Sequence, residues 1–208
     1  MVTGPIPVFN NNLSVYRTTR IRRFAEHGWK PSSLLWFLQI TQSNCRDYKR
    51  ENLLPDVKFR TWKPDDNVPL EEMIQTSRWT SALADYRKSV LRGDSTSQVL
   101  VVVVSGRIAG FCQWVRGDQI TDYGGMGSIF ALVGQRTLPA EQGYILTLMV
   151  DPLFRGKGMG RALFVKSCQA QFQIGIKEIQ GWAPWLKFYE RLGCKVTGQF
   201  LQMGLQIQ

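Results

Sequence analysis

Residues 146–164 read LTLMVDPLFRGKGMGRALF, and this stretch decides the fold class. An apolar run ends at Asp151-Pro152, a basic, glycine-dense turn follows, and an apolar segment of helical spacing completes it. Glycines between a strand and a helix let the backbone approach a ligand closely. The first N–H groups of the helix and its dipole then favour an anion. The stretch therefore predicts a phosphate or pyrophosphate site at residues 155–161.

Residue spacing distinguishes this stretch from two known phosphate-binding motifs. A Walker A loop requires Ser or Thr after its lysine, and a Rossmann fingerprint requires a glycine spacing that Gly156, Gly158 and Gly160 do not have. The pattern present is Arg155-x-x-Gly158-x-Gly160. It resembles the acyl-CoA-binding signature R/Q-x-x-G-x-G/A of the GNAT N-acetyltransferase superfamily.

A second block supports the resemblance. Residues 182–196, WAPWLKFYERLGCKV, are similar to the family's helix that carries F-Y-x-x-x-G-F/C before a strand. Upstream, FRTWKPDD looks like the family's first strand and turn, and the valine-rich hairpin like its second and third strands. The resemblance covers residues 56–208 and implies an α/β fold. The implied fold has a GNAT-like mixed, mostly antiparallel central sheet with a parallel βαβ portion, and helices lie on both faces of the sheet.

The residue patterns predict a matching order of elements. The expected strands lie at 56–62, 98–104, 107–115, 144–150 and 176–183, with one or two more in 194–207. Helices are expected at 63–78, 80–93, 158–172 and 184–193, and residues 116–142 are expected to be irregular.

Residues 1–55 differ from the rest in composition. Between Tyr16 and Arg50 there are many Lys and Arg side chains against only Glu26 and Asp47. LSVYRTTRIRRFAEHG suggests a basic amphipathic helix, and SSLLWFLQI a following apolar helix. We interpret residues 1–55 as a basic N-terminal extension that packs on an acyltransferase domain at 56–208.

Composition restricts the chemistry further. The 208 residues carry a net charge of +10, which predicts an acidic ligand or partner. The four cysteines contain no C-x-x-C pair, so we expect neither a zinc site nor a disulfide framework. His27 is the single histidine, so most histidine-dependent sites are excluded. The N-terminus lacks the pattern of a secretory signal and the apolar runs are too short to span a membrane, so a cytoplasmic location is expected.

The resemblance implies acetyl-CoA as the acyl donor. Backbone groups of Leu148, Met149 and Val150 would then contact the acetyl carbonyl and the pantetheine arm. The pyrophosphate would be held by Arg155, Gly156, Lys157, Gly158, Met159, Gly160 and Arg161. Tyr189 matches the family's general acid, since a phenol of pKa about 10 can protonate or hydrogen-bond a departing thiolate. The alternative is a tyrosine that only fills space.

The general base is not identified by the sequence. At the position where many family members carry a glutamate this chain has Leu146, followed by Thr147, and the strand 144–150 contains no carboxylate. Glu141, Asp122 or a water chain to backbone carbonyls are the candidates. An α-amine of pKa about 8 would need less help from a base than a lysine of pKa about 10.4.

Aromatic residues also depart from the family pattern. Trp182 and Trp185 replace a common asparagine and a small residue, and they either stack on a flat ligand or pack in the core. Trp114, Tyr123 and the DYGGMG loop lie where the family often builds its acceptor site.

Three functions remain open at this stage. The first is an acetyl-CoA-dependent N-acetyltransferase, as monomer or homodimer, acting on an unidentified amine. The second is a nucleic-acid-associated member that uses the basic N-terminal region on an aminoacyl-tRNA or a nucleobase. The third is an inactive acyl-CoA-binding module.

Overall fold

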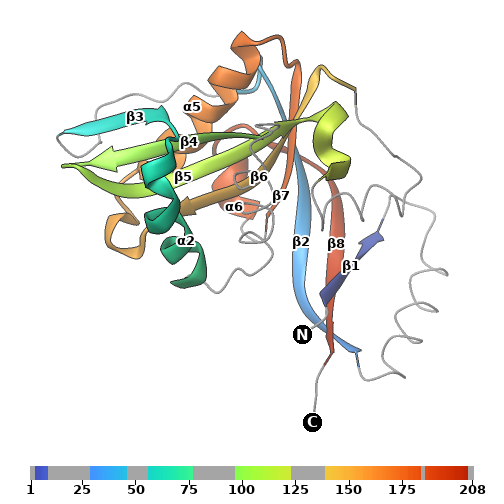
Figure 1. Ribbon diagram of the computed structural model, residues 1–208. Helices are drawn as coiled ribbons and strands as arrows, with labels where there is room; N and C mark the ends of the chain where they lie inside the picture. Colours follow the sequence, from blue (N-terminus) through green and yellow to red (C-terminus); the bar gives the residue numbers. More distant parts are fainter. Residues whose placement is uncertain are drawn as a thin grey trace.

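The computed structural model describes residues 3–8, 29–45, 56–76, 97–122, 139–183 and 186–205 (Figure 1). Its described strands form one eight-stranded sheet in the order β1-β8-β2-β7-β6-β5-β4-β3. The strands are β1 (Thr3–Val8), β2 (Trp29–Thr41), β3 (Val57–Thr61), β4 (Ser97–Val104), β5 (Arg107–Arg116), β6 (Gln142–Val150), β7 (Glu178–Ala183) and β8 (Lys195–Leu205). The helices are α2 (Asn67–Thr76), α5 (Met159–Gln173) and α6 (Leu186–Glu190), with 3-10 turns η2 (Pro64–Asp66), η3 (Gly117–Asp122) and η4 (Pro152–Phe154).

The sheet is mixed and mostly antiparallel. β6 and β7 are its one parallel pair among the described strands, and α5 connects them. β3, β4, β5 and β6 pair antiparallel in chain order, with β4 and β5 joined by a tight turn at Ser105 and Gly106. The predicted fold class is confirmed.

Helices cover both faces of the sheet (Figure 1). On one face α5 buries Leu163, Val165 and Cys168 in the larger apolar cluster. On the other face α2 buries Leu70 and Ile74 in a separate cluster that includes side chains from β4, β5 and β6. The predicted amphipathic segments therefore occupy opposite sides of the central strands. No helix within the described ranges is long and apolar enough to cross a membrane.

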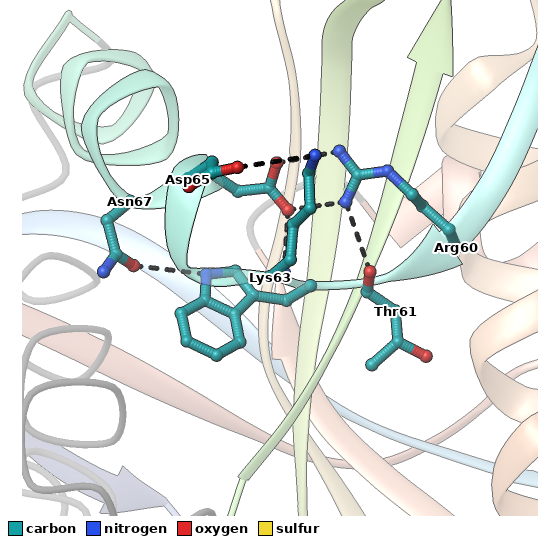
Figure 2. Close-up of polar contacts among 7 residues, drawn as sticks. Arg60, Thr61, Lys63, Asp65 and Asn67 are labelled. Carbon is teal, nitrogen blue, oxygen red and sulfur yellow. Dashed lines mark hydrogen bonds and ion pairs between the residues drawn. The ribbon is translucent and has the colours of Figure 1, made fainter.

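A partly buried ion pair links the start of α2 to the edge strand β3. The Arg60 guanidinium makes two hydrogen bonds to the Asp66 carboxylate, at 2.6 and 2.7 Å. The Lys63 amide donates a third, at 2.9 Å, to the same carboxylate. Beside this pair, Trp62 donates its indole N–H to the Asn67 side chain (Figure 2). These contacts join the start of α2 to β3 and the turn after it.

The N-terminal region contributes two strands, and the helix predicted for SSLLWFLQI is wrong. β2 runs from Trp29 to Thr41 and pairs with β7 through residues 36–41 and with β8 through residues 29–39. Leu38 and Ile40 are buried in the larger apolar cluster. A short apolar run reads equally as a buried helix or a strand, and here two neighbouring strands satisfy its backbone.

Proline at residue 31 is accommodated because the pairing of β2 with β8 shifts register between Pro31 and Ser33. A proline cannot donate to a ladder, so strands tolerate it at such irregularities.

The other predicted elements divide into two groups. The strands, the hairpin and the helices expected within 56–76, 97–115 and 144–205 are confirmed, and the one or two final strands expected are a single strand, β8. The basic helix expected at 13–28, the helix expected at 80–93 and the DYGGMG loop beyond Asp122 lie outside the described residues.

Candidate active site

The parallel strands β6 and β7 separate halfway along the sheet. They pair only from Gln142 with Glu178 to Ile145 with Gly181. β6 then continues to Val150, and β7 ends at Ala183. Residues 147–150 are therefore paired with β5 on one edge and with no described strand on the other. This leaves main-chain groups of Leu148, Met149 and Val150 available to an extended ligand.

A bulge at Leu146 marks the point of separation. In the β5–β6 register Gln113 is opposite Thr147 and Trp114 is opposite Ile145, so Leu146 has no partner on β5. A bulge bends its strand and increases the local twist. The bulge accounts for the divergence of β6 from β7.

Two glycines in the following loop have left-handed backbone conformations. Gly156 has φ 75° and Gly158 has φ 79°. Gly158 is the N-cap residue of α5, and no side chain caps the helix there. The first helical hydrogen bond runs from the Ala162 amide to the Gly158 carbonyl, so the preceding amides point ahead of the helix. This arrangement fits a pyrophosphate.

The cations of the loop are exposed, but two of them fold back on the backbone. Arg155 donates from Nε to the Val150 carbonyl at 3.0 Å, and Lys157 donates from Nζ to the Leu153 carbonyl at 3.1 Å. The side chain of Met159 is buried, so Met159 can offer the site its amide only.

Asp151 fastens the loop to the neighbouring hairpin. Its carboxylate accepts a hydrogen bond from the Leu153 amide at 2.9 Å and pairs with Arg107 at 3.1 Å. Asp151 is thus a positioning residue that the sequence motif did not identify, although an acid just before Pro152 is a typical capping signal.

Both sequence blocks meet at Gly160 in the first turn of α5. A Cβ built at Gly160 would lie 3.5 Å from Val150 Cγ2 and 3.7 Å from Phe188 Cζ. Gly160 thus brings the end of β6 and α6 together beside the loop.

Tyr189 lies on α6 beside the point where β6 and β7 separate. Its ring makes edge contacts with Phe164 and Phe188, at centroid distances of 5.4 and 4.8 Å. A cavity of about 20 Å³, the size of one water, is lined by Tyr189 together with Ile145 and Gly181.

The thiols around Tyr189 come from three separate elements. Burial raises the pKa of the Tyr189 phenol well above its usual range, and the nearby Cys112, Cys194 and Cys168 raise it further. The phenol therefore keeps its proton at neutral pH.

The two carboxylates proposed as general base lie at the opposite end of β6. Glu141 precedes β6 by one residue, so it lies about 23 Å along the strand from Leu148. Asp122 ends the turn that follows β5, and Arg116 of β5 pairs with Gly143. Both residues therefore belong to the end of β6 that is remote from Leu148.

The aromatic residues predicted near an acceptor are only partly described. Trp114 is buried within β5 and forms part of the larger apolar cluster. The Trp182 side chain, Trp185 and Tyr123 lie outside the described residues.

A second hollow lies on the α2 face, not in the gap between β6 and β7. It measures about 920 Å³ and extends from Arg60 and α2 across Arg107 to Met149 and Arg155. Its charges are mainly paired internally, as in Arg60 with Asp66.

Comparison with protein families matches residues 95–195, just under half of the chain, to an acetyltransferase (GNAT) domain. No curated protein is significantly similar to the sequence.

Solved structures with the same fold include three N-acetyltransferase relatives. A GCN5-related glucosamine N-acetyltransferase region of a fungal multi-domain GH3 β-N-acetylglucosaminidase has TM-score 0.71 at 17% identity, over 96% of this chain and 24% of that one. A GCN5-related N-acetyltransferase from Sphaerobacter thermophilus has TM-score 0.62 at 19% identity, over 97% of this chain and 58% of that one. A tandem GNAT protein from the clavulanic acid biosynthesis pathway has TM-score 0.60 at 12% identity, over 97% and 61%.

This chain spans about a quarter of the length of the first of these structures and about three-fifths of the other two. At such identities the likeness shows the fold alone.

Proposed function

We propose that this chain, whose residues 95–195 match an acetyltransferase (GNAT) domain, transfers an acetyl group from acetyl-CoA to an amine of an acceptor. The observation that carries the proposal is the separation of β6 from β7 at Ile145, with Tyr189 beside the point of separation and the glycine loop at the end of β6.

The residues present fit an acyl-CoA. The open edge of β6 at Leu148–Val150 offers main-chain groups to the pantetheine arm, and the first turn of α5 offers amides to the pyrophosphate. The exposed side chains of Arg155, Lys157 and Arg161 add positive charge around the loop. Acetyl-CoA supplies the activated thioester, and the chain supplies its position.

Tyr189 acts by donating a hydrogen bond to the departing sulfur. A free thiol has a pKa of about 8.5, while burial holds the pKa of Tyr189 well above its usual range. Full proton transfer from the phenol to the thiolate is then uphill. Stabilising the developing charge is the contribution that this geometry supports.

The acceptor that suits this site best carries an amine that needs little help from a general base. β6 contains no carboxylate, and Glu141 lies at its far end. An α-amine of pKa about 8 is partly neutral near pH 7, whereas a lysine amine of pKa about 10.4 is not. We therefore place α-amines first in the acceptor panel.

Calorimetry with acetyl-CoA tests the proposal, together with a CoA-release assay on a panel of amines. Gly158→Glu places a carboxylate in the predicted pyrophosphate site and should abolish binding. The matched control is Gly175→Glu, since Gly175 shares the positive φ of Gly158, has open space around it and follows the opposite end of α5.

Gly175→Glu should keep the wild-type affinity if it remains folded by circular dichroism. Absence of binding by the folded wild type would overturn the proposed function. Binding without release of CoA on any amine would support the inactive acyl-CoA-binding module instead.

A further inference from the structure

The hollow on the α2 face reaches the open edge of β6. One wall includes Glu72 and Met73 of α2, and another includes Met149 and Val150 at the end of β6. Met149 and Val150 belong to the segment that pairs with β5 on one edge and with no described strand on the other. The hollow, at about 920 Å³, has the size of a small-molecule site. A small molecule bound here would therefore meet an acyl donor held along β6.

Tyr189 and this hollow lie on opposite faces of the sheet. The Tyr189 ring contacts Phe164 of α5, whereas Met149 is buried in the separate apolar cluster beneath α2. A thioester in the gap between β6 and β7 would thus have Tyr189 on the α5 face and the hollow on the α2 face. The sulfur would leave on one side of the sheet while the acceptor occupies the other.

Glu72 has the carboxylate in this hollow that is open to a ligand. Its main-chain carbonyl accepts a hydrogen bond from the Thr76 hydroxyl, but its carboxylate has no ion pair or hydrogen bond with the residues that the structure describes. A positive group that enters the hollow would therefore find a partner at Glu72. The other acids that line the hollow each have a neighbouring cation, in the pairs Asp66 with Arg60, Asp151 with Arg107 and Asp65 with Lys63.

The position of Glu72 indicates which part of an acceptor it would contact. Glu72 is on the α2 wall and the open edge is on the β6 wall, so different groups of one acceptor reach them. A carboxylate also raises the pKa of an ammonium beside it, which would disfavour the neutral amine that must attack the thioester. The group at Glu72 is then a second cation that does not react.

We propose that the acceptor binds in this hollow and carries, besides the amine that is acetylated, a second cationic group that pairs with Glu72. The inference rests on the proposed acetyl transfer and narrows its acceptor to amines with two positive groups. The reacting amine attacks the thioester carbon, the C–N bond forms, the C–S bond breaks, and the proton lost from nitrogen ends on the CoA sulfur. The second group keeps its charge throughout and positions the acceptor.

Lysinamide and norleucinamide are matched probes for the second charge. Both have an α-amine and an unbranched side chain of equal carbon number, but only lysinamide carries an ammonium at its end. We expect the wild type to acetylate lysinamide with a KM about fivefold below that for norleucinamide, the upper range for an exposed ion pair. Added salt should reduce this preference, because it screens an exposed pair.

Glu72→Gln should remove the preference for lysinamide and leave the acetyl-CoA Kd unchanged. Glu71→Gln is the matched control, since it removes the same charge from the neighbouring position of α2 and Glu71 does not line the hollow. The control should keep the preference for lysinamide, provided that circular dichroism shows it folded.

Methionine methyl NMR measures binding in the hollow without turnover. Met73 and Met149 line the hollow, whereas Met159 is buried in the cluster beneath α5. Lysinamide should shift the methyl signals of Met73 and Met149 and leave that of Met159 in place. In Glu72→Gln the same titration should move none of the three.

The outcomes separate this inference from the proposed function. Equal KM values for the two amides, or a preference for lysinamide that survives in Glu72→Gln, would overturn the inference and leave the proposed function intact. Failure of the folded wild type to bind acetyl-CoA would overturn both. If acetyl-CoA binds but neither amide is acetylated, the methyl signals decide, because shifts that Glu72→Gln removes support the assignment and unmoved signals overturn it.

Discussion

At the scale of single residues, backbone conformation explains the glycine motif better than charge does. Gly156 and Gly158 have positive φ, whereas Gly160 does not and sits instead in close packing with Val150 and Phe188. The loop cations have contacts of their own, as Arg155 shows by donating to the Val150 carbonyl. The motif thus combines two conformational requirements with one packing requirement.

Alanine substitutions at Gly158 and Gly160 separate the conformational requirement from the packing requirement. Gly158→Ala should lower the free energy of unfolding by roughly 1–2 kcal/mol, because a Cβ is strained at this φ. Gly160→Ala adds only ordinary van der Waals contacts, so its stability should change by less than about 1 kcal/mol. Urea unfolding of both variants measures the difference, and equal losses would contradict this explanation.

The Tyr189 hydroxyl should matter for turnover and not for binding. Tyr189→Phe keeps the ring contacts with Phe164 and Phe188 but removes the donor. We expect kcat to fall about 100-fold, the lower range for a positioned acid, with the acetyl-CoA Kd unchanged.

Tyr144→Phe is the matched control for this substitution, because Tyr144 is also a buried tyrosine with a raised pKa but is not among the residues that line the Tyr189 cavity. Wild-type kcat in Tyr189→Phe, measured by CoA release, would show that Tyr189 only fills space.

At the scale of elements, local sequence explains how each helix begins but not what holds it to the sheet. Asp66 lies directly before α2, and its carboxylate forms an ion pair of two hydrogen bonds with Arg60 of β3. Burial alone would raise the pKa of Asp66, but hydrogen bonds from Arg60 and the Lys63 amide lower it overall. The carboxylate therefore links an edge strand to the helix.

The Asp66 ion pair should give stability a specific pH dependence. Because the folded-state pKa of Asp66 is lowered, its contribution is complete above the unfolded pKa of about 3.9 and is lost as the pH falls through the folded pKa. Asp66→Asn should cost about 2 kcal/mol at neutral pH.

The difference between wild type and Asp66→Asn should shrink when urea unfolding is repeated below about pH 3. Asp65→Asn is the control, since its carboxylate is exposed and its 3.7 Å pair with Lys63 should contribute little. A difference in the free energy of unfolding that stays constant with pH would show that it does not arise from the Asp66 ion pair.

At the scale of the whole molecule, β2 unites the two parts that composition separates. It lies between β7 and β8, which do not pair with each other in the described sheet (Figure 1). Ile40 of β2 is 2% exposed within the same core as α5. A domain limited to residues 56–208 would leave both neighbouring strands without this partner.

A truncated chain tests whether residues 56–208 need β2 to fold. The fragment 56–208, expressed alone, should lack a cooperative thermal transition, because β7 and β8 would each expose an unpaired edge. In the full chain, Ile40→Ala should cost about 2–5 kcal/mol, while Val68→Ala at an exposed position should cost little. A cooperative transition in the fragment would support a domain boundary at residue 55.

The sequence by itself determined the glycine loop, the strand before it, the helix after it and the Phe188-Tyr189 block. These features are local, because turn conformations, helix starts and hydrophobic periodicity depend on residues that are close in sequence. The mixed sheet followed from the order of the elements and from the family resemblance.

Only the tertiary structure decided the role of β2 and the convergence of four cysteines on the larger apolar cluster. Each depends on which distant segments become neighbours. The apolar run 33–41 suits a buried helix or a strand equally, and it became a strand because β7 and β8 offered backbone partners on both sides. Such long-range pairing is set by the burial of the whole core, which no local stretch of sequence specifies.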